Sequence, residues 1–213
     1  MYGMTETSNW IGGISGTAAD HIDGSVGAPW GGEIRVADER GHAHASGHGE
    51  LMVQSPSVMS GYLDDDAATR EVLDAGWLRT GDIGEIDGLG RARIVGRIKH
   101  QINRGGLKIS AEEVDRLLEQ HPDVAEACAF AVPDAVSGEA VGVAVVARPD
   151  ARLDPLELLR WCTGRSRSEV TPKRLFVVDA LARTSRGKLD RIAMCARLSG
   201  GGNPMADAAR GVP

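Results

Sequence analysis

The sequence changes its pattern of apolar residues near Gly96, and this change constrains the fold most strongly. Before that point, short alternating or β-branched segments are separated by Gly, Asp and Pro, which is typical of strands in a small sheet or barrel. After it, strand-like segments alternate with segments of helical period. With 42% hydrophobic residues available for a core, we expect a mixed α/β protein in which a β-rich part precedes a small α+β domain.

The first part is predicted to consist mostly of strands. Alternating segments predict strands at residues 33–36, 50–54, 82–86 and 91–95. Asp87-Gly88, between the last two, has the composition of a hairpin turn. One helix is predicted over residues 64–73, because the aspartates at its start favour the helix dipole.

Two helices of the second part have clear start signals. Ser110 and Glu113 have the spacing of a capping box, and an apolar stripe follows until His121. Asp154 and Pro155 are typical of an N-cap and a first helical residue. The second part is therefore predicted to contain both helices and strands.

The remaining elements of the second part are less strongly marked. Strands are predicted at residues 101–103, 107–109, 124–132, 140–147 and 174–178. Pro133-Asp134 is interpreted as a turn after the third of these strands. A short helix is predicted to end near Leu198, and residues 199–213, rich in Gly, Ala and Pro, are predicted to be a flexible tail.

Charge and hydropathy exclude some functional classes. The net charge of −6 argues against general binding of nucleic acid. The segment 160–198 nevertheless has ten Lys or Arg against three Asp or Glu, which suits a nucleotide or coenzyme A, an ordinary solvated face being the alternative. Neither a run of about 18 apolar residues nor a signal-peptide pattern is present, so we expect a cytoplasmic protein without membrane contact.

Neither the cysteines nor the histidines indicate a metal site. The three cysteines are far apart and are interpreted as buried structural thiols: Cys128, Cys162 and Cys195. Three histidines lie close together in a glycine-rich segment that we interpret as a solvated loop: His42, His44 and His48.

Four segments resemble, in order and spacing, the later core motifs of the acyl-adenylate-forming family. They are Tyr2-Gly3-Met4-Thr5-Glu6, Trp77 to Asp82, Gly96-Arg97-Ile98-Lys99 through Gly105-Gly106, and Ser185-Arg186-Gly187-Lys188. That family includes acyl-CoA and aryl-CoA synthetases, firefly luciferase and adenylation domains of nonribosomal peptide synthetases. The resemblance implies that a carboxylate and Mg-ATP give an acyl-adenylate, from which a thiol such as coenzyme A then displaces AMP. ATP, Mg²⁺ and coenzyme A are the implied cofactors.

The resemblance also implies a domain organisation. Residues 1–96 would be the β-rich, C-terminal part of the large domain, 97–99 a hinge, and 100–198 the mobile C-terminal AMP-binding domain, followed by the tail. In this family the small domain rotates between the two half-reactions about a residue two positions after the motif arginine. Lys99 occupies that position here.

The first motif places an aromatic ring, a small flexible residue, a hydroxyl and a carboxylate in succession. Such groups can stack on adenine, approach a phosphate and hold Mg²⁺. The resemblance implies that Tyr2 flanks adenine and that Thr5 contacts the α-phosphate. It also implies that Gly3 and Met4 complete the nucleotide loop and that Glu6 helps to bind the metal.

Asp82 and Arg97 are the other predicted nucleotide contacts. Asp82 follows Gly81 at the predicted start of a strand, where its carboxylate can accept hydrogen bonds from both ribose hydroxyls. The guanidinium of Arg97 has a fork geometry that suits oxygens of ribose or phosphate.

Lys188 is the predicted catalytic residue. A lysine on a mobile loop can neutralise charge that develops between the carboxylate and the α-phosphate. For the second half-reaction, the resemblance implies a thiol channel at Asn103, Gly105 and Gly106, whose glycines let a pantetheine arm approach the backbone. Some adenylating enzymes have lysine where this chain has Asn103, so no catalytic lysine is carried over there.

The family also needs an upstream loop that holds the β- and γ-phosphates and most of the acyl pocket, and neither is found in this sequence. We therefore expect a fragment, a truncated product or one half of a split enzyme with a separate N-terminal half as a partner. Three functions stay open. They are a ligase acting on a carboxylic acid and coenzyme A, an adenylation domain that loads an acyl or peptidyl carrier protein, and a non-catalytic binding module. The intact motif residues favour the ligase.

Overall fold

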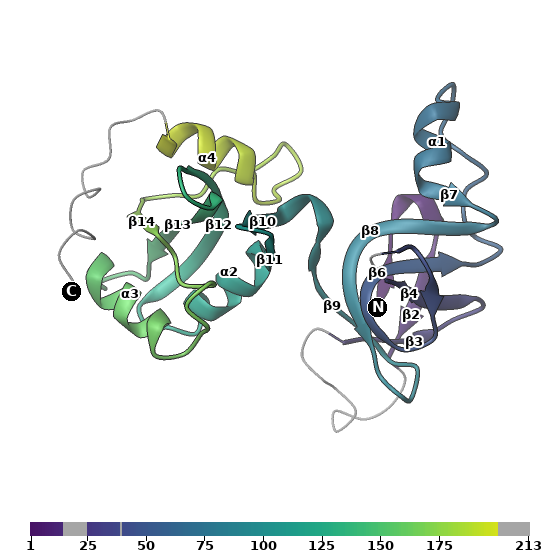
Figure 1. Ribbon diagram of the computed structural model, residues 1–213, viewed down its shortest axis with the longest axis horizontal. Helices are drawn as coiled ribbons and strands as arrows, with labels where there is room; N and C mark the ends of the chain where they lie inside the picture. The colour runs from purple at the N-terminus through teal and green to yellow at the C-terminus, as the bar shows by residue number, and fades with distance from the viewer. Residues whose placement is uncertain (15–24, 39, 200–213) are drawn as a thin grey trace. The chain divides into compact units, whose positions relative to one another are not determined.

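The computed structural model describes residues 1–14, 25–38 and 40–199 of the 213-residue chain. The chain separates into two compact units, Met1–Lys99 and His100–Pro213 (Figure 1). Each unit buries its own set of apolar side chains. The mixed α/β fold class is confirmed. The predicted tail lies outside the described residues from residue 200 onward.

The first unit is built on an antiparallel sheet. Its strands pair in the order β1, β2, β3, β9, β8, β6, β4, β5, with β7 also on β8 (Figure 1). The strand bounds are β1 Tyr2–Gly3, β2 Trp10–Gly13, β3 Ser25–Pro29, β4 Glu33–Ala37, β5 Ala43–His44, β6 Gly47–Gln54, β7 Leu73–Asp74, β8 Trp77–Ile86 and β9 Ala92–Arg97. Alternate side chains of β4 and β6 turn inward, because successive residues of a strand point to opposite faces. They pack with Tyr2, Ile11 and Val26 in the core.

Helix α1 (Asp66–Val72) is shorter than the predicted helix over residues 64–73. The carboxylate of Asp65 accepts a hydrogen bond from the Ala68 amide at 2.9 Å, so Asp65 is the N-cap. At the other end Leu73 pairs with Leu78 in the β7–β8 hairpin instead of continuing the helix.

The predicted hairpin after β8 is present, with its turn shifted. Asp87 Oδ1 accepts hydrogen bonds from the amides of Leu89 and Arg91, each at 2.9 Å. The left-handed backbone conformation falls on Gly90 (φ 74°) and not on Gly88. The side chain of Asp87 thus holds the turn by accepting hydrogen bonds from backbone amides up to four residues later.

The second unit has a mixed sheet. Its strands are β10 Gln101–Arg104, β11 Leu107–Ser110, β12 Val124–Asp134, β13 Gly138–Ala147 and β14 Arg174–Val177. They pair in the order β11, β10, β13, β12, and β14 runs parallel to β13. Helices α2 (Ala111–Glu119) and α3 (Pro155–Thr163) cover one face, and α4 (Arg191–Ser199) lies on the other (Figure 1).

The predicted helix starts are confirmed, whereas one predicted turn is wrong. Ser110 Oγ accepts a hydrogen bond from the Glu113 amide at 3.3 Å, and the Asp154 carboxylate accepts one from the Leu156 amide at 2.8 Å. Pro133-Asp134, predicted as a turn, instead extends β12 opposite β13. A proline is tolerated there because β12 ends the order of paired strands, and an edge strand need not donate every ladder hydrogen bond.

The cysteines and the helices also bear on the sequence predictions. Cys128 and Cys162 are buried and Cys195 is partly buried, which agrees with their interpretation as structural thiols. Burial raises the pKa of both Cys128 and Cys162 to about 11, which keeps them protonated and inert. None of the helices within residues 1–14, 25–38 and 40–199 is long and apolar enough to cross a membrane.

Candidate functional site

Asp82 lies in a bulge within β8, not at the start of a strand as predicted. Three residues of β8, Thr80 to Asp82, face a single residue of β6, Leu51. Gly81 supplies the left-handed conformation that this requires (φ 70°), and the Thr80 hydroxyl donates to the Leu51 carbonyl at 2.7 Å. Because a bulge redirects the side chains that follow it, the local structure decides where Asp82 points.

The bulge brings Asp82 to two other predicted site residues. The Tyr2 hydroxyl donates to Asp82 Oδ2 at 2.8 Å, and Arg97, paired with Asp82 across β8 and β9, places its Nε 2.6 Å from Oδ1. Asp82 is only 2% exposed, yet Oδ1 accepts no aligned hydrogen bond from a described residue. Burial and the Asp82 charge raise the pKa of the Tyr2 hydroxyl, which therefore stays a donor.

The first motif forms a short 3₁₀ turn, η1 (Thr5–Thr7), after β1. The buried Thr7 hydroxyl lies 2.9 Å from the Met4 carbonyl and 2.7 Å from that of Asn9, and it accepts from the Met4 amide at 3.1 Å. Gly3 and Thr5 are exposed. Thr7 fixes the shape of this loop and was not predicted, although a Thr-Ser-Asn run is typical of a turn held by its own side chains.

The first two motifs meet around one cavity of about 260 Å³. Glu6 lies beside it, and its Oε1 accepts a hydrogen bond from the Tyr62 hydroxyl at 3.1 Å. The residues that line the cavity include Met4, Glu6, Glu50, Tyr62, Arg79, Thr80 and Gly81. The predicted metal-binding carboxylate and the Asp82 bulge therefore border the same space.

Glu50 supports the bulge and was not predicted. Its Oε1 accepts a hydrogen bond from the Gly81 amide at 3.1 Å, and its Oε2 accepts two from Arg79, at 3.0 and 2.6 Å. The Glu50 side chain is 9% exposed. The sequence could have indicated this role only if β6 and β8 had been aligned, because Glu50 and Arg79 are brought together by the pairing of these two strands.

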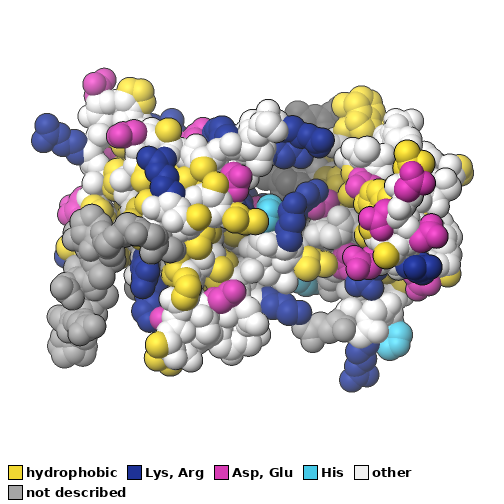
Figure 2. Space-filling view, turned by 90° about the horizontal axis from the view of Figure 1, so that it is seen from above, with side chains coloured by type: hydrophobic (Ala, Val, Ile, Leu, Met, Phe, Trp, Pro, Cys, Tyr) yellow, Lys and Arg dark blue, Asp and Glu magenta, His cyan; other side chains and the backbone are white. Residues whose placement is uncertain are grey.

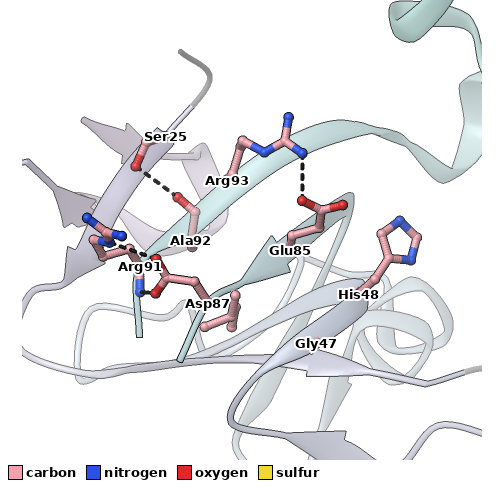
Figure 3. Close-up of a pocket in the computed structure, with 9 residues that line it drawn as sticks. Ser25, Gly47, His48, Glu85, Asp87, Arg91, Ala92 and Arg93 are labelled. Atoms are coloured by element: carbon pink, nitrogen blue, oxygen red, sulfur yellow. Dashed lines mark hydrogen bonds and ion pairs between the residues drawn. The ribbon is translucent and has the colours of Figure 1, made fainter. Parts of the chain in front are cut away.

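A second cavity in the first unit, of about 440 Å³, does not collect the predicted residues (Figure 3). Its charged groups pair with each other: Arg93 with Glu85 at 2.6 Å and Arg91 with Asp87 at 2.7 Å. His48 also lines it, whereas among the described residues no predicted nucleotide or metal contact does. The pairing leaves little charge in this cavity for a ligand.

Lys188 lies in a tight loop of the second unit. The Thr184 amide donates to the Lys188 carbonyl at 2.8 Å, and the Gly187 amide donates to the Thr184 carbonyl at 2.9 Å. Gly187 adopts a left-handed conformation (φ 76°), and Arg183 and Leu189 pair as a bridge below the turn. The Lys188 side chain is exposed, and no described residue pairs with its ammonium group.

A largely buried network anchors α4, which begins just after this loop. Arg191 Nη2 lies 2.6 Å from Asp115 Oδ2 and 3.4 Å from Glu112 Oε1, and its Nη1 donates to the Ala129 carbonyl at 2.8 Å. Burial raises the pKa of Asp115 to about 6. Burial also acts to raise the pKa of Glu112, but the hydrogen bond with His100 and the charge of Arg191 lower it below its usual value.

The predicted thiol-channel residues form the β10–β11 hairpin. Gly105 (φ 60°) and Gly106 (φ 91°) both adopt left-handed conformations, which suits a two-residue hairpin turn. The Gly106 amide donates to Asn103 Oδ1 at 3.0 Å, and the Gly105 amide donates to the Ser137 carbonyl at 2.8 Å. Asn103 and both glycines are exposed. The turn is therefore held by hydrogen bonds at both glycines and lies at the surface.

Other predicted features lie at the surface. Lys99 is exposed in a 3₁₀ turn, η3 (Ile98–His100), and it is the last residue of the first unit. His42 and His44 both contact the Asp38 carboxylate, at 3.4 and 3.2 Å. On the face that Figure 2 shows, Lys and Arg side chains are spread out and do not gather in one patch.

Two family models match the chain over most of its length. A model described as AMP-binding enzyme matches residues 1–63, and one described as AMP-binding enzyme C-terminal domain matches residues 113–188. The chain belongs to the acyl-adenylate-forming family of AMP-binding enzymes. The matched segments include the first motif and, at the end of the second, Lys188 of the last motif.

Individual members of the acyl-adenylate-forming family are similar to the chain in sequence and in structure. A probable CoA ligase of Humulus lupulus is 42% identical over 80% of the chain and 33% of its own length, and an oxalate–CoA ligase of Arabidopsis thaliana is 40% identical over 80% and 34%. The o-succinylbenzoate CoA synthetase of Bacillus subtilis, in complex with its acyl-adenylate intermediate, is 33% identical. It has a TM-score of 0.83 and covers 91% of this chain and 40% of that one. The chain thus spans about a third of the length of these two curated relatives.

Proposed function

We propose that the chain is the part of an ATP-dependent, AMP-forming acid–thiol ligase that binds ribose and supplies the lysine for adenylation. The observation that carries this proposal is the buried Asp82 carboxylate, which the Tyr2 hydroxyl and the Arg97 guanidinium hold in one orientation. Each carboxylate oxygen can accept more than one hydrogen bond, so Asp82 keeps acceptor capacity beyond its contacts with Tyr2 and Arg97. A ribose hydroxyl is a donor that suits it.

ATP and Mg²⁺ fit the first unit. Mg²⁺ usually keeps several waters and binds through one or two carboxylates plus substrate phosphates, so Glu6 suffices as its protein ligand. Glu6 borders the cavity next to the Asp82 bulge, and the exposed Thr5 hydroxyl next to it would contact the α-phosphate. The Tyr2 ring is 6% exposed and its hydroxyl orients Asp82, while its place beside adenine stays a prediction.

The second unit would supply the catalytic group. We infer that residues 1–96 end the large domain, that 97–99 form the hinge with Lys99 at its pivot, and that 100–198 form the mobile domain. The boundary between the compact units, at Lys99, supports this division. In one orientation the ammonium group of Lys188 would neutralise charge at the carboxylate and α-phosphate during adenylation. In the other, the Gly105-Gly106 turn would face the incoming thiol.

Coenzyme A is the acceptor we propose. The curated relatives described above are named as CoA ligases. The open turn at Gly105 and Gly106 leaves room for a pantetheine arm, because nothing stands within 4 Å of a Cβ built on Gly106. The substrate would be a carboxylic acid whose pocket is formed by other parts of the family fold. We also infer that the enzyme acts in the cytoplasm.

The decisive experiment joins this chain to the N-terminal two-thirds of a family member and measures ATP–pyrophosphate exchange with a panel of carboxylic acids. We expect exchange that Lys188→Ala lowers by about 100-fold or more, the size expected for a lost transition-state donor. Asp82→Ala should raise the KM for ATP and weaken discrimination against 2′-deoxy-ATP. Exchange that tolerates Lys188→Ala would contradict the proposal. Thioester formation with coenzyme A, but not with a carrier protein, would establish the acceptor.

A further inference from the structure

Arg183 connects the Lys188 loop to the sheet beneath it. Its Nη1 donates to the Gly187 carbonyl at 2.9 Å, and its Nη2 donates to Glu126 Oε1 at 2.7 Å. The Gly187 carbonyl belongs to the peptide that enters Lys188. One guanidinium therefore ties that peptide to β12, which lies 57 residues earlier in the chain.

The sheet presents Glu126 on the face that carries this loop. Along β12, Cys128 and Phe130 point to the face that packs against Leu181 and α4, whereas Ala127 and Ala129 point to the face under α2 and α3. Glu126 has the same parity as Cys128, and strand side chains alternate between faces. Leu181 and Leu189, before and after the loop, pack in the same cluster, so both ends of the loop are held.

We propose that Arg183, oriented by Glu126, is a positioning residue that fixes the peptide before Lys188 for the adenylation step. This rests on the proposed role of Lys188. The Lys188 side chain has several rotatable bonds and no partner among the described residues, so its Cα and the direction of its chain depend on the turn. Catalytic groups lose much of their effect when displaced by about 1 Å.

The ion pair itself contributes little to folding, which separates positioning from stability. The Arg183 and Glu126 side chains are each 44% exposed, and exposed pairs stabilise proteins only weakly. A change at either residue should therefore leave the fold intact while loosening the turn. The planar fork of arginine can serve two acceptors at once, which a lysine ammonium at the end of a flexible stem does less well.

The first test measures the two half-reactions separately in the joined ligase described above. Arg183→Gln should slow formation of the acyl-adenylate by roughly 10-fold, with KM for ATP unchanged, because the transition state rather than the nucleotide is affected. Thioester formation from supplied acyl-adenylate should stay within about twofold, since Lys188 acts in adenylation only. Glu126→Ala should have a similar effect, and the double variant should be no worse than either single one.

Controls distinguish the possible failures. Arg197→Gln removes an exposed arginine of α4 and should leave both half-reactions unchanged. Arg183→Lys should recover part of the adenylation rate. If Lys188→Ala slows adenylation but Arg183→Gln does not, or if Arg183→Gln slows both half-reactions equally, this inference is wrong. If Lys188→Ala itself has no effect, the proposed function is wrong instead.

The second test uses this chain alone and needs no activity. Hydrogen exchange of the Thr184 and Gly187 amides, whose bonds close the turn, should be faster in Arg183→Gln and Glu126→Ala than in the unmodified chain. Exchange in the β12–β13 hairpin should not change. Equal protection of the two turn amides in all variants would overturn the inference.

Discussion

Asp82 and Lys188, the two residues with the most specific predicted roles, are presented in opposite ways on similar backbones. Each follows directly after a glycine in a left-handed conformation, Gly81 at φ 70° and Gly187 at φ 76°. Asp82 is 2% exposed and held by two partners, whereas Lys188 is exposed and none of its described neighbours pairs with its ammonium group. The glycine in each case creates a sharp change of chain direction that aims the next side chain.

The difference suits the two proposed roles. A group that recognises a ligand in every step gains from being fixed beforehand, because no ordering cost is then incurred on binding. A group that is needed in one half-reaction only must be able to leave the site in the other. In the Lys188 loop the backbone is restrained while the ammonium group stays free, so the lysine can be positioned in one half-reaction and leave the site in the other. The following predictions test this contrast between Asp82 and Lys188.

The largest expected effect concerns the anchor after the loop. Arg191→Ala would leave the buried Asp115 without its partner, and breaking a buried ion pair costs about 3–5 kcal/mol of unfolding free energy. Arg197→Ala, in the same helix but exposed, should change stability by less than about 0.5 kcal/mol. Urea denaturation followed by circular dichroism measures both. Equal small effects would mean that α4 does not hold the loop.

The Asp82 site should respond to the loss of a single hydroxyl. Tyr2→Phe removes the bond to Asp82 Oδ2, and a buried hydrogen bond to a charged group contributes about 1.5–3 kcal/mol. Tyr62→Phe is the matched control, because that hydroxyl bonds to Glu6 at an exposed position. Its effect on the denaturation midpoint should be small. A Tyr2→Phe protein as stable as the unmodified chain would show that Asp82 is not held as described.

Substitution of Gly81 and of Gly187 should reduce stability by similar amounts, although Asp82 and Lys188, which follow them, differ in burial. Gly81→Ala and Gly187→Ala place a Cβ where no atom stands within 4 Å, so only backbone strain is added. A left-handed conformation costs a non-glycine residue roughly 1–2 kcal/mol, and less for asparagine. At both positions the alanine variant should have a lower midpoint temperature of unfolding than the asparagine variant. Gly88→Ala, also in open space but without a left-handed conformation, should not destabilise.

The smallest effect is a pH dependence in the second unit. The ion pair with Lys173 and the hydrogen bonds from Ser137 hold the pKa of Asp134 well below its usual range. A lowered pKa in the folded state contributes stability that is present above the unfolded value and lost as the pH falls below it. The Asp134→Asn variant should therefore lose less unfolding free energy than the unmodified chain as the pH falls below about 4. Denaturation curves recorded at several pH values measure this. The same loss of stability at acid pH in the variant and in the unmodified chain would contradict the prediction.

Local patterns predicted those parts of the fold that depend on neighbours in sequence. Ser110 and Asp154 cap their helices because a cap needs only the next three residues. The turn at Pro133 was wrong, and the bulge at Asp82 was missed, because each depends on the partner strand. The sequence of one segment shows neither whether its strand lies at the edge of a sheet nor how it aligns with the strand that it pairs with.

The same distinction explains the site. Tyr2, Asp82 and Arg97 were identified through motif resemblance, but the bonds that join them span up to 80 residues. Glu50 and Arg183, which support the two predicted key residues, were missed because their partners lie 31 and 57 residues away. Residues that touch a ligand tend to leave motifs, whereas residues that orient them only need to be close in space.

The parallel pairing of β14 with β13 has a consequence for how the chain folds. The β12–β13 hairpin joins segments that are adjacent in sequence, whereas β14 reaches β13 only after a crossover that includes α3. Contacts of such high sequence separation form late, because loop-closure entropy must be overcome first. The Lys188 loop follows β14 directly, so it acquires its support last. Because domains fold largely as units and the N-terminal one is synthesised first, a newly made chain would form the sheet of its first unit before the Lys188 loop was supported.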